Sequence, residues 1–191
     1  MKAGYRFLVE NELSSAASPP APSHQRSTWK GLWKLNVPNR IKTLLWRAAS
    51  DALPTRVNLM KRKVLTEASC QLCGSMSESS LHALWLCPKL GSVWDTHLGP
   101  LRNDAKDCES LLEIIQTSME KGHPTDLVAM IMSLIWNRRN KLRLGESVPD
   151  LRLLHSMARE ALQDFIMPTP RLPLPLPLEV SPSGSRPLWI G

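Results

Sequence analysis

Apolar residues recur at helical spacing in several stretches of this chain. The clearest run lies between Pro38 and Pro54, and its apolar positions are Ile41, Leu44, Leu45, Ala48 and Ala52. Prolines mark helix boundaries because they lack an N–H donor and restrict the residue before them. The pattern therefore predicts a helix of about three turns between the two prolines.

A second, shorter helix is predicted directly after Pro54. Thr55 is suited to cap its first turn, with Val57 and Met60 facing inward. Its end is basic, which suits the negative end of the helix dipole. The basic residues there are Lys61, Arg62 and Lys63.

Three more helices are predicted in the C-terminal half. The first ends at Gly122 and has an apolar face formed by Cys108, Leu111, Leu112, Ile115 and Met119. The second opens at residues 124–126 and runs through "LVAMIMSLIWNRRNKLRLG" to Gly145. The third is capped by Asp150, and its apolar face is formed by Leu151, Leu154, Ala158, Ala161, Leu162 and Phe165.

Composition supports a mainly α fold, because the chain has 7 Trp but only 2 Phe and 1 Tyr, the aromatic residues on which strands depend. Residues 1–27 are predicted to be a short segment followed by a flexible Ser/Pro-rich loop over 13–27. Residues 28–166 form the predicted helical domain. Residues 167–191 contain "PTPRLPLPLPLEVSPSGSRP" and are expected to be an extended or disordered tail. This tail is either a linker, the favoured interpretation, or a ligand for an aromatic-lined groove of a protein partner.

Positive charge is concentrated in one part of the chain. The formal net charge is +7, yet from Arg26 to Thr66 ten Lys or Arg residues stand against Asp51 alone. That segment carries +9, so the remaining residues sum to −2. Such a segment suits a polyanion, RNA or DNA, because phosphates held by Lys and Arg release counterions. A solvated basic face without a ligand is the alternative, and charge alone does not separate the two.

The N-terminal sequence "MKAGYRFLVENELSS" has no apolar run of signal-peptide length, and the longest apolar run, Leu127 to Trp136, is too short to span a bilayer. We therefore expect no membrane partner and an intracellular location, in the nucleus or the cytoplasm. In such a reducing compartment a Cys-x2-Cys pair favours a metal over a disulfide.

Three cysteines and one histidine form the strongest chemical signal in the sequence. Cys70, Cys73, His82 and Cys87 have the spacing Cys-x2-Cys-x8-His-x4-Cys. Thiolates and imidazole are the ligands that a tetrahedral Zn²⁺ prefers, and four of them leave no open position for catalysis. We therefore predict a structural zinc knuckle that organises the helices. Burial of the four residues in a core without metal is the alternative, and Cys108 is expected to be an ordinary buried thiol.

The spacing of His82 and Cys87 does not fit a regular helix. Five residues correspond to a rotation of about 500°, so the two side chains would diverge by about 140°. Our hypothesis is that a helix begins near Glu78, presents His82 and unwinds at Pro88, so that Cys87 turns back toward the metal.

With these residues assembled, the sequence resembles the zinc-binding domain found toward the C-terminal end of plant LINE-type (non-LTR) retrotransposon reverse transcriptase polyproteins. The resemblance rests on "KAGYRFLVE", "WKGLWKLNVPNRIKTLLWRAASDALPTRVNLMKRKV", the Cys70, Cys73, His82 and Cys87 pattern, and "IWNRRNKLRLG". It implies a place after a reverse transcriptase and often before a ribonuclease H domain. We expect this chain to be a domesticated or decaying fragment that has not inherited the polymerase activity.

A non-catalytic module that binds nucleic acid through its basic segment is the favoured function. The candidate contact residues are Arg40, Lys42, Trp46, Arg47, Lys61, Arg62 and Lys63. Lys42 and Trp46 are one helical turn apart, which would set a cation beside a ring for base stacking. Packing of Trp46 against Trp33 or the knuckle is the competing interpretation. A second basic cluster is also explained by its position at a helix C-terminus; it consists of Arg138, Arg139, Lys141 and Arg143.

Other functions stay open at this point. A protein-interaction or scaffold role would need the zinc equally, and an open reading frame without any cellular role is a further possibility. An enzyme is not expected, because no nucleophile elbow, phosphate loop or His-Glu-x-x-His motif organises the Ser, His and Asp residues.

Overall fold

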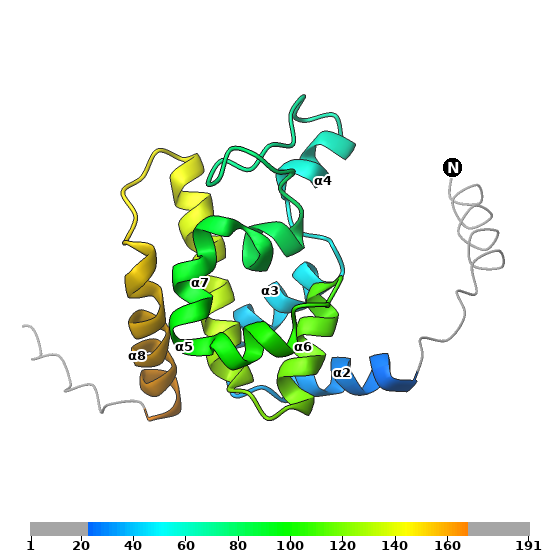
Figure 1. Cartoon of the computed structure of the whole chain (residues 1–191), viewed down its shortest axis with the longest axis vertical. Coiled ribbons are helices and arrows are strands. Elements are labelled where there is room, and N and C mark those ends of the chain that lie inside the picture. The colour runs from blue at the N-terminus through cyan, green and yellow to red at the C-terminus, as the bar shows by residue number, and fades with distance from the viewer. Residues whose placement is uncertain (1–22, 168–191) are drawn as a thin grey trace, which may run out of the picture.

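The computed structural model describes residues 23–167, and the predicted N-terminal segment and Pro-rich tail lie outside this range. The described part is built from helices joined by turns and loops, the longest of which runs over residues 62–81 between α4 and η1 (Figure 1). The α-helices are α2 (Ser23–Lys34), α3 (Asn39–Ala49), α4 (Arg56–Lys61), α5 (Gly91–Asp104), α6 (Leu111–Glu120), α7 (Thr125–Arg143) and α8 (Leu154–Ile166). Three short helical turns complete them: η1 (His82–Leu86), η2 (Pro88–Leu90) and η3 (Leu151–Leu153). The predicted mainly α fold is confirmed, and β-structure within residues 23–167 is limited to one bridge between Ser69 and Ser77.

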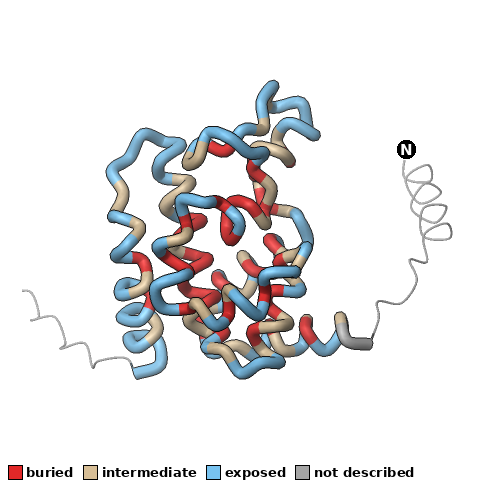
Figure 2. The backbone as a smooth tube through the Cα atoms, viewed as in Figure 1, coloured by how far each residue is buried: buried red, intermediate tan, exposed pale blue. Residues whose placement is uncertain are grey.

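Helix α7 forms the centre of the fold. It contacts α8, α3, α6 and η1, and the run from Val128 to Ser133 is buried on every side. This burial explains why the run from Leu127 to Trp136 is almost entirely apolar rather than amphipathic. Figure 2 shows the buried residues gathered in α7 and the segments that face it, whereas residues 60–67, at the end of α4 and after it, are largely exposed.

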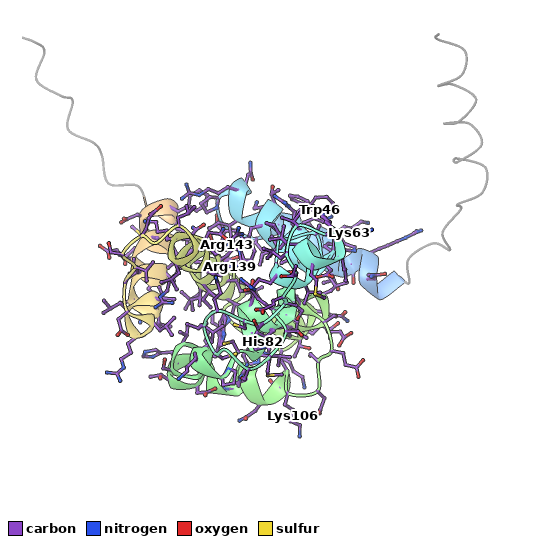
Figure 3. All side chains as sticks on the ribbon, turned by 90° about the horizontal axis from the view of Figure 1, so that it is seen from above. Trp46, Lys63, His82, Lys106, Arg139 and Arg143 are labelled. Atoms are coloured by element: carbon purple, nitrogen blue, oxygen red, sulfur yellow. The ribbon has the colours of Figure 1, made fainter. Side chains whose placement is uncertain are left out.

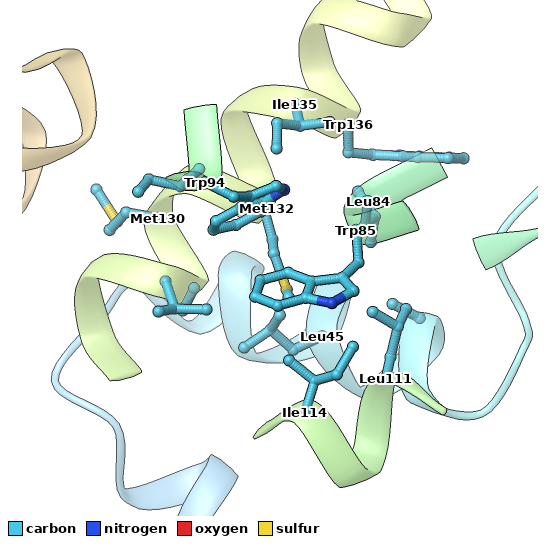
Figure 4. Close-up of a cluster of buried hydrophobic side chains, with 14 of the residues drawn as sticks. Leu45, Leu84, Trp85, Trp94, Leu111, Ile114, Met130, Met132, Ile135 and Trp136 are labelled. Carbon is cyan, nitrogen blue, oxygen red and sulfur yellow. The ribbon is translucent and has the colours of Figure 1, made fainter. Parts of the chain in front are cut away.

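Two tryptophans fill the centre of the core. The rings of Trp85 and Trp94 lie 4.7 Å apart between centroids, tilted by 50°, and both side chains are buried (Figure 4). Trp85 comes from η1, which carries the predicted histidine ligand, and Trp94 comes from α5. The segment that carries the predicted ligands therefore shares one core with the helices.

Several helix ends follow the sequence signals closely. The side chains of Thr55, Ser110 and Asp150 accept hydrogen bonds from backbone N–H groups of the turns that they open. Gly122 and Gly145 end α6 and α7 in the left-handed conformation, with φ of +71° and +74°. The predicted C-terminal ends of these two helices are confirmed.

The first helical segment begins earlier than predicted. Helix α2 starts at Ser23, inside the expected flexible loop over 13–27 and before the expected domain boundary at residue 28. Its apolar side explains this extension, because Thr28 and Leu32 are buried and Trp29 packs against the core. Tertiary packing here outweighs the weak helix propensity of the Ser-rich sequence.

The predicted inward face of α4 was partly wrong. Met60 is exposed, and Asn58 is buried in its place. The Asn58 amide donates to the carbonyl oxygens of Asp51, at 2.7 Å, and Leu53, at 2.9 Å. A polar side chain therefore faces inward because it satisfies carbonyl groups of the preceding turn.

Other apolar faces were predicted too wide. Helix α3 ends at Ala49, so Ala52 lies beyond it, and α6 begins at Leu111, after Cys108. In α8, Leu154 and Ala158 are buried, but Ala161 and Phe165 are exposed. Among the helices of residues 23–167, none has the length and apolar character needed to cross a membrane.

Candidate metal centre and basic face

Cys70 and Cys73 lie in a tight turn closed by backbone hydrogen bonds. The N–H of Gly74 donates to the Cys70 carbonyl and the N–H of Cys70 donates to the Met76 carbonyl, both at 2.7 Å. Gly74 has a φ of +76°, a conformation that side chains disfavour, which explains a glycine directly after the second cysteine. The turn therefore holds both thiols on one side.

His82 and Cys87 are aligned by a π-helical turn, which the sequence did not predict. The N–H of Cys87 donates to the carbonyl of His82 at 3.0 Å, a hydrogen bond across five residues. A π turn sets residues five apart above one another, whereas an α-helix does so for residues three or four apart. The predicted unwinding at Pro88 is confirmed, because Cys87 has an extended ψ of 124°, and the helical turn begins at Ser80, two residues after Glu78.

The four predicted ligands converge on one point. The Sγ atoms of Cys70, Cys73 and Cys87 and a ring nitrogen of His82 all lie within 4.8 Å of one another. Cys70, His82 and Cys87 are buried and Cys73 is partly exposed; Figure 3 shows His82 within the body of the protein. The Nε2 atom of His82 lies 3.4 Å from the Cys73 Sγ.

This donor set fits a tetrahedral metal ion. With metal–sulfur bonds of about 2.3 Å, neighbouring ligand atoms in a tetrahedral site lie about 3.8 Å apart. All four ligand atoms lie within 4.8 Å of one another, so no pair needs to close by more than about 1 Å. Three sulfurs and one nitrogen also match the borderline-soft character of Zn²⁺.

The three thiols differ in acidity. Backbone N–H groups, first that of Ser75, lower the pKa of the Cys73 thiol to about 6, and the Ser75 hydroxyl acts in the same direction. Burial raises the pKa of Cys87 to about 12 and also raises that of Cys70. A bound cation is therefore needed to keep Cys70 and Cys87 as thiolates near neutral pH.

A buried ion pair joins the metal-binding segment to the central helix. The Nε of Arg139 on α7 donates to a carboxylate oxygen of Glu78 at 2.8 Å, and the Glu78 side chain is only 2% exposed. The Arg139 guanidinium also lies over the Trp136 ring, 4.9 Å from its centroid. Sequence reasoning missed this pair, because the two residues are 61 positions apart and no local pattern connects them.

Hydrogen bonds of Glu78 and Ser80 close the knuckle, residues 68–90, and connect it to α4 and to the turn after α3. Its N–H donates to the Ala68 carbonyl at 2.7 Å, and its carbonyl accepts from the Val57 N–H at 3.2 Å. Two residues later, the Ser80 hydroxyl donates to the Asp51 carboxylate at 2.9 Å. The knuckle is thereby fixed to α7, to α4 and to the turn after α3.

The predicted nucleic-acid contacts lie on α3 and around the end of α4. On α3, Arg40, Trp46 and Arg47 are exposed and Lys42 is partly buried. At the end of α4, all three candidate residues are exposed: Lys61, Arg62 and Lys63. Figure 3 shows Trp46 and Lys63 toward the same part of the molecule.

Some of these cations already have partners. The Lys42 ammonium donates to the Trp33 carbonyl at 3.1 Å, and the Arg47 guanidinium donates to the Ala52 carbonyl at 3.4 Å. Lys61 lies 3.5 Å from the Asp51 carboxylate, but both side chains are more than half exposed, so this pair is weak.

Trp46 is 44% exposed, in contrast to Trp85 and Trp94 in the core. Part of its surface is therefore open to a ligand. Cys108 lies outside the metal cluster, half buried, with its Sγ 3.6 Å from the Thr117 hydroxyl.

Comparison with known proteins agrees with this geometry. Residues 2–94 match the family described as zinc-binding in reverse transcriptase. A relative from Arabidopsis thaliana, provisionally named a ribonuclease H protein, is 30% identical over 113 residues, which cover 59% of this chain and 17% of the relative. No solved structure matches the chain.

Proposed function

We propose that Cys70, Cys73, His82 and Cys87 hold one structural Zn²⁺ ion, because residues 2–94, which contain all four, match the family described as zinc-binding in reverse transcriptase. Four protein ligands leave no position for a reacting water, so the ion would support folding rather than catalysis. The observation that carries this proposal is the convergence of the four ligand atoms within 4.8 Å.

Metal content tests the proposal directly. Protein purified without chelator should contain one zinc per chain by elemental mass spectrometry. A chelator should remove the ion and lower the thermal midpoint of unfolding. A folded protein with no bound metal would disprove the zinc site.

We further propose that the chain is a non-catalytic module that binds single-stranded RNA or DNA. Support comes from the exposed cations on α3 and at the end of α4, together with the exposed surface of Trp46. Cations would hold phosphates, and the indole ring would stack on a base. The zinc would fix the knuckle that positions α4 through the Glu78 backbone.

Binding of a fluorescent oligonucleotide across a salt series tests this function. The key variant changes Lys61, Arg62 and Lys63 together to Gln, and a matched control changes Lys121, Arg152 and Arg159, which are equally exposed on other helices or turns. If each cation at the end of α4 holds one phosphate, the salt slope should fall by about 2 in the first variant and stay unchanged in the control.

Two outcomes would contradict nucleic-acid binding: no binding by the zinc-loaded wild type at low salt, or binding with a flat salt dependence. A zinc-loaded, folded protein that fails in this way would favour the scaffold role. Pull-down with and without residues 168–191 then tests whether the Pro-rich tail recruits a protein partner.

A further inference from the structure

Three arginines lie near one another beside the knuckle, and one of them is paired with a carboxylate. Arg139 forms the buried ion pair with Glu78. Arg56 begins α4 and directly precedes Val57, whose N–H donates to the Glu78 carbonyl at 3.2 Å. Arg143 lies one helical turn beyond Arg139 on α7. One negative charge therefore faces three positive charges, which leaves a local excess of two.

The pKa of Arg139 reflects this excess of positive charge. Burial lowers the pKa of its guanidinium most, the Glu78 carboxylate opposes that change, and the positive charges of Arg143 and Arg56 lower it further. Both neighbouring arginines are thus close enough to repel the central one.

Arg56 carries an unsatisfied donor. Its Nε is buried, and it has no hydrogen-bond partner among residues 23–167. A buried donor without an acceptor costs about 1–3 kcal/mol, so native proteins usually satisfy such groups with water, an ion or a ligand. An anion in this position would accept from the Arg56 guanidinium and reduce the repulsion.

Helix stabilisation does not explain Arg56. A cation at the first position of a helix opposes the helix dipole, which favours negative charge there. Arg143 does lie at a favourable C-terminal position, as the sequence suggested, but Arg56 gains nothing of this kind. Its position is better explained by a negatively charged ligand.

The three arginines also lie next to the candidate nucleic-acid contacts at the end of α4. Arg56 opens the same short helix that leads to Lys61, Arg62 and Lys63. In Figure 3, Arg139 and Arg143 lie between α8 and the region of Trp46 and Lys63. A single-stranded nucleic acid bound at the end of α4 and running toward α7 would therefore reach the three arginines.

We propose that Arg56 and Arg143, arranged around the Glu78–Arg139 pair, bind a phosphate of the nucleic-acid backbone. The inference rests on the proposed nucleic-acid function and extends the contact surface from α4 to the C-terminal part of α7. Guanidinium groups suit this role because their N–H donors match two oxygens of one phosphate. Arg139 stays engaged with Glu78 and acts as a positioning residue.

A double variant, Arg56→Gln with Arg143→Gln, tests the site on the zinc-loaded full chain with a fluorescent oligothymidylate probe. If the two arginines share one phosphate, the salt slope should fall by about 0.7, and affinity at low salt should fall on the order of tenfold. The matched control, Arg152→Gln with Arg159→Gln on η3 and α8, should bind like the wild type. Wild-type slope and affinity in the folded double variant would overturn the proposal.

Single variants separate folding from binding. Arg143 is exposed, so Arg143→Gln should fold normally and lose part of the affinity. Arg56→Lys keeps the charge but not the planar donor pair, and it should bind between the wild type and Arg56→Gln. If Arg143→Gln binds as tightly as the wild type, the phosphate site is wrong even where the double variant fails to fold.

The outcomes distinguish this inference from the proposed function. If the Lys61, Arg62 and Lys63 variant loses binding while the arginine double variant does not, nucleic-acid binding stands and only the additional site fails. If the wild type does not bind the probe at low salt, both fail.

Discussion

The knuckle, residues 68–90, and the helix pair α7 and α8 are stabilised in different ways. Besides the core packing of Leu84, Trp85 and Leu90, the knuckle depends on a few specific contacts: the cluster of four candidate metal ligands, one buried ion pair and a small set of backbone hydrogen bonds. Helices α7 and α8 instead pack along much of their length through apolar side chains that contribute individually small amounts. A single substitution can therefore disorder the knuckle, whereas the helix pair should weaken in proportion to the area lost.

Loss of one metal ligand should produce the largest effect. His82→Ala removes a buried ligand, and metal binding in small zinc modules contributes about 10–16 kcal/mol of apparent free energy. We expect no retained zinc and rapid amide exchange over residues 68–90, with slower exchange preserved in α7. Elemental analysis and hydrogen exchange measure both effects.

Cys108→Ala is the matched control, because Cys108 lies outside the cluster. It should retain one zinc per chain. If His82→Ala melts at the wild-type temperature with unchanged exchange, the knuckle does not depend on metal.

Breaking the ion pair should produce the next largest effect. Glu78→Ala leaves Arg139 buried without its partner, which typically costs about 3–5 kcal/mol. Urea unfolding of the zinc-loaded protein measures the change. Asp107→Ala, which breaks a solvent-exposed pair with Lys106, should leave the unfolding midpoint unchanged. Equal midpoints for both variants would show that Glu78 does not fix the knuckle to α7.

A cavity in the helical core should cost less and leave the metal in place. Ile131 is fully buried on α7, and Ile131→Ala should destabilise the protein by about 2–5 kcal/mol. The zinc content should remain one per chain, since no ligand moves. Loss of zinc together with stability would show that the two regions unfold as one unit and would remove the distinction between them.

The pH dependence of zinc affinity should be the smallest of these effects, when the change in binding free energy is counted per pH unit. Between pH 7 and 8 the Cys73 thiol, with a pKa of about 6, is already ionised, while Cys70 and Cys87 keep their protons. Zinc binding should therefore release two thiol protons, and affinity should fall about 100-fold for each unit that pH decreases. This corresponds to about 2.7 kcal/mol per unit.

Calorimetry in buffers of different ionisation enthalpy counts the released protons. Below pH 6 the Cys73 thiol is protonated as well, so the thiol contribution should rise to three. Release of three protons already at pH 7.5 would contradict the low pKa of Cys73.

Local signals allowed much of the fold to be predicted. Pro38 and Pro54 bracket α3, and glycines end α6 and α7 where their apolar patterns stop. Helix α5 was not predicted, because it contains Gly99 and Pro100 and bends at Leu98, which interrupts any regular period. Its formation depends on burial of Trp94 and Leu101, which is a tertiary effect.

At the site, ligand identity could be predicted but geometry could not. The thiols and the imidazole can be recognised as candidate metal ligands from their residue types and spacing. The π turn between His82 and Cys87 has no sequence signature of its own. The Glu78–Arg139 pair was equally hidden, since it forms only after α7 packs against the knuckle. Asn58 likewise looks like an ordinary surface residue until the turn it satisfies is known.

The wide turn that aligns His82 with Cys87 limits how this stretch can change length during evolution. Deletion of one residue would restore ordinary α geometry, in which side chains four apart share a face, so both ligands would stay aligned. An added residue has no still wider regular turn to accommodate it. We therefore expect homologous chains to tolerate one residue fewer between these ligands, and not one more.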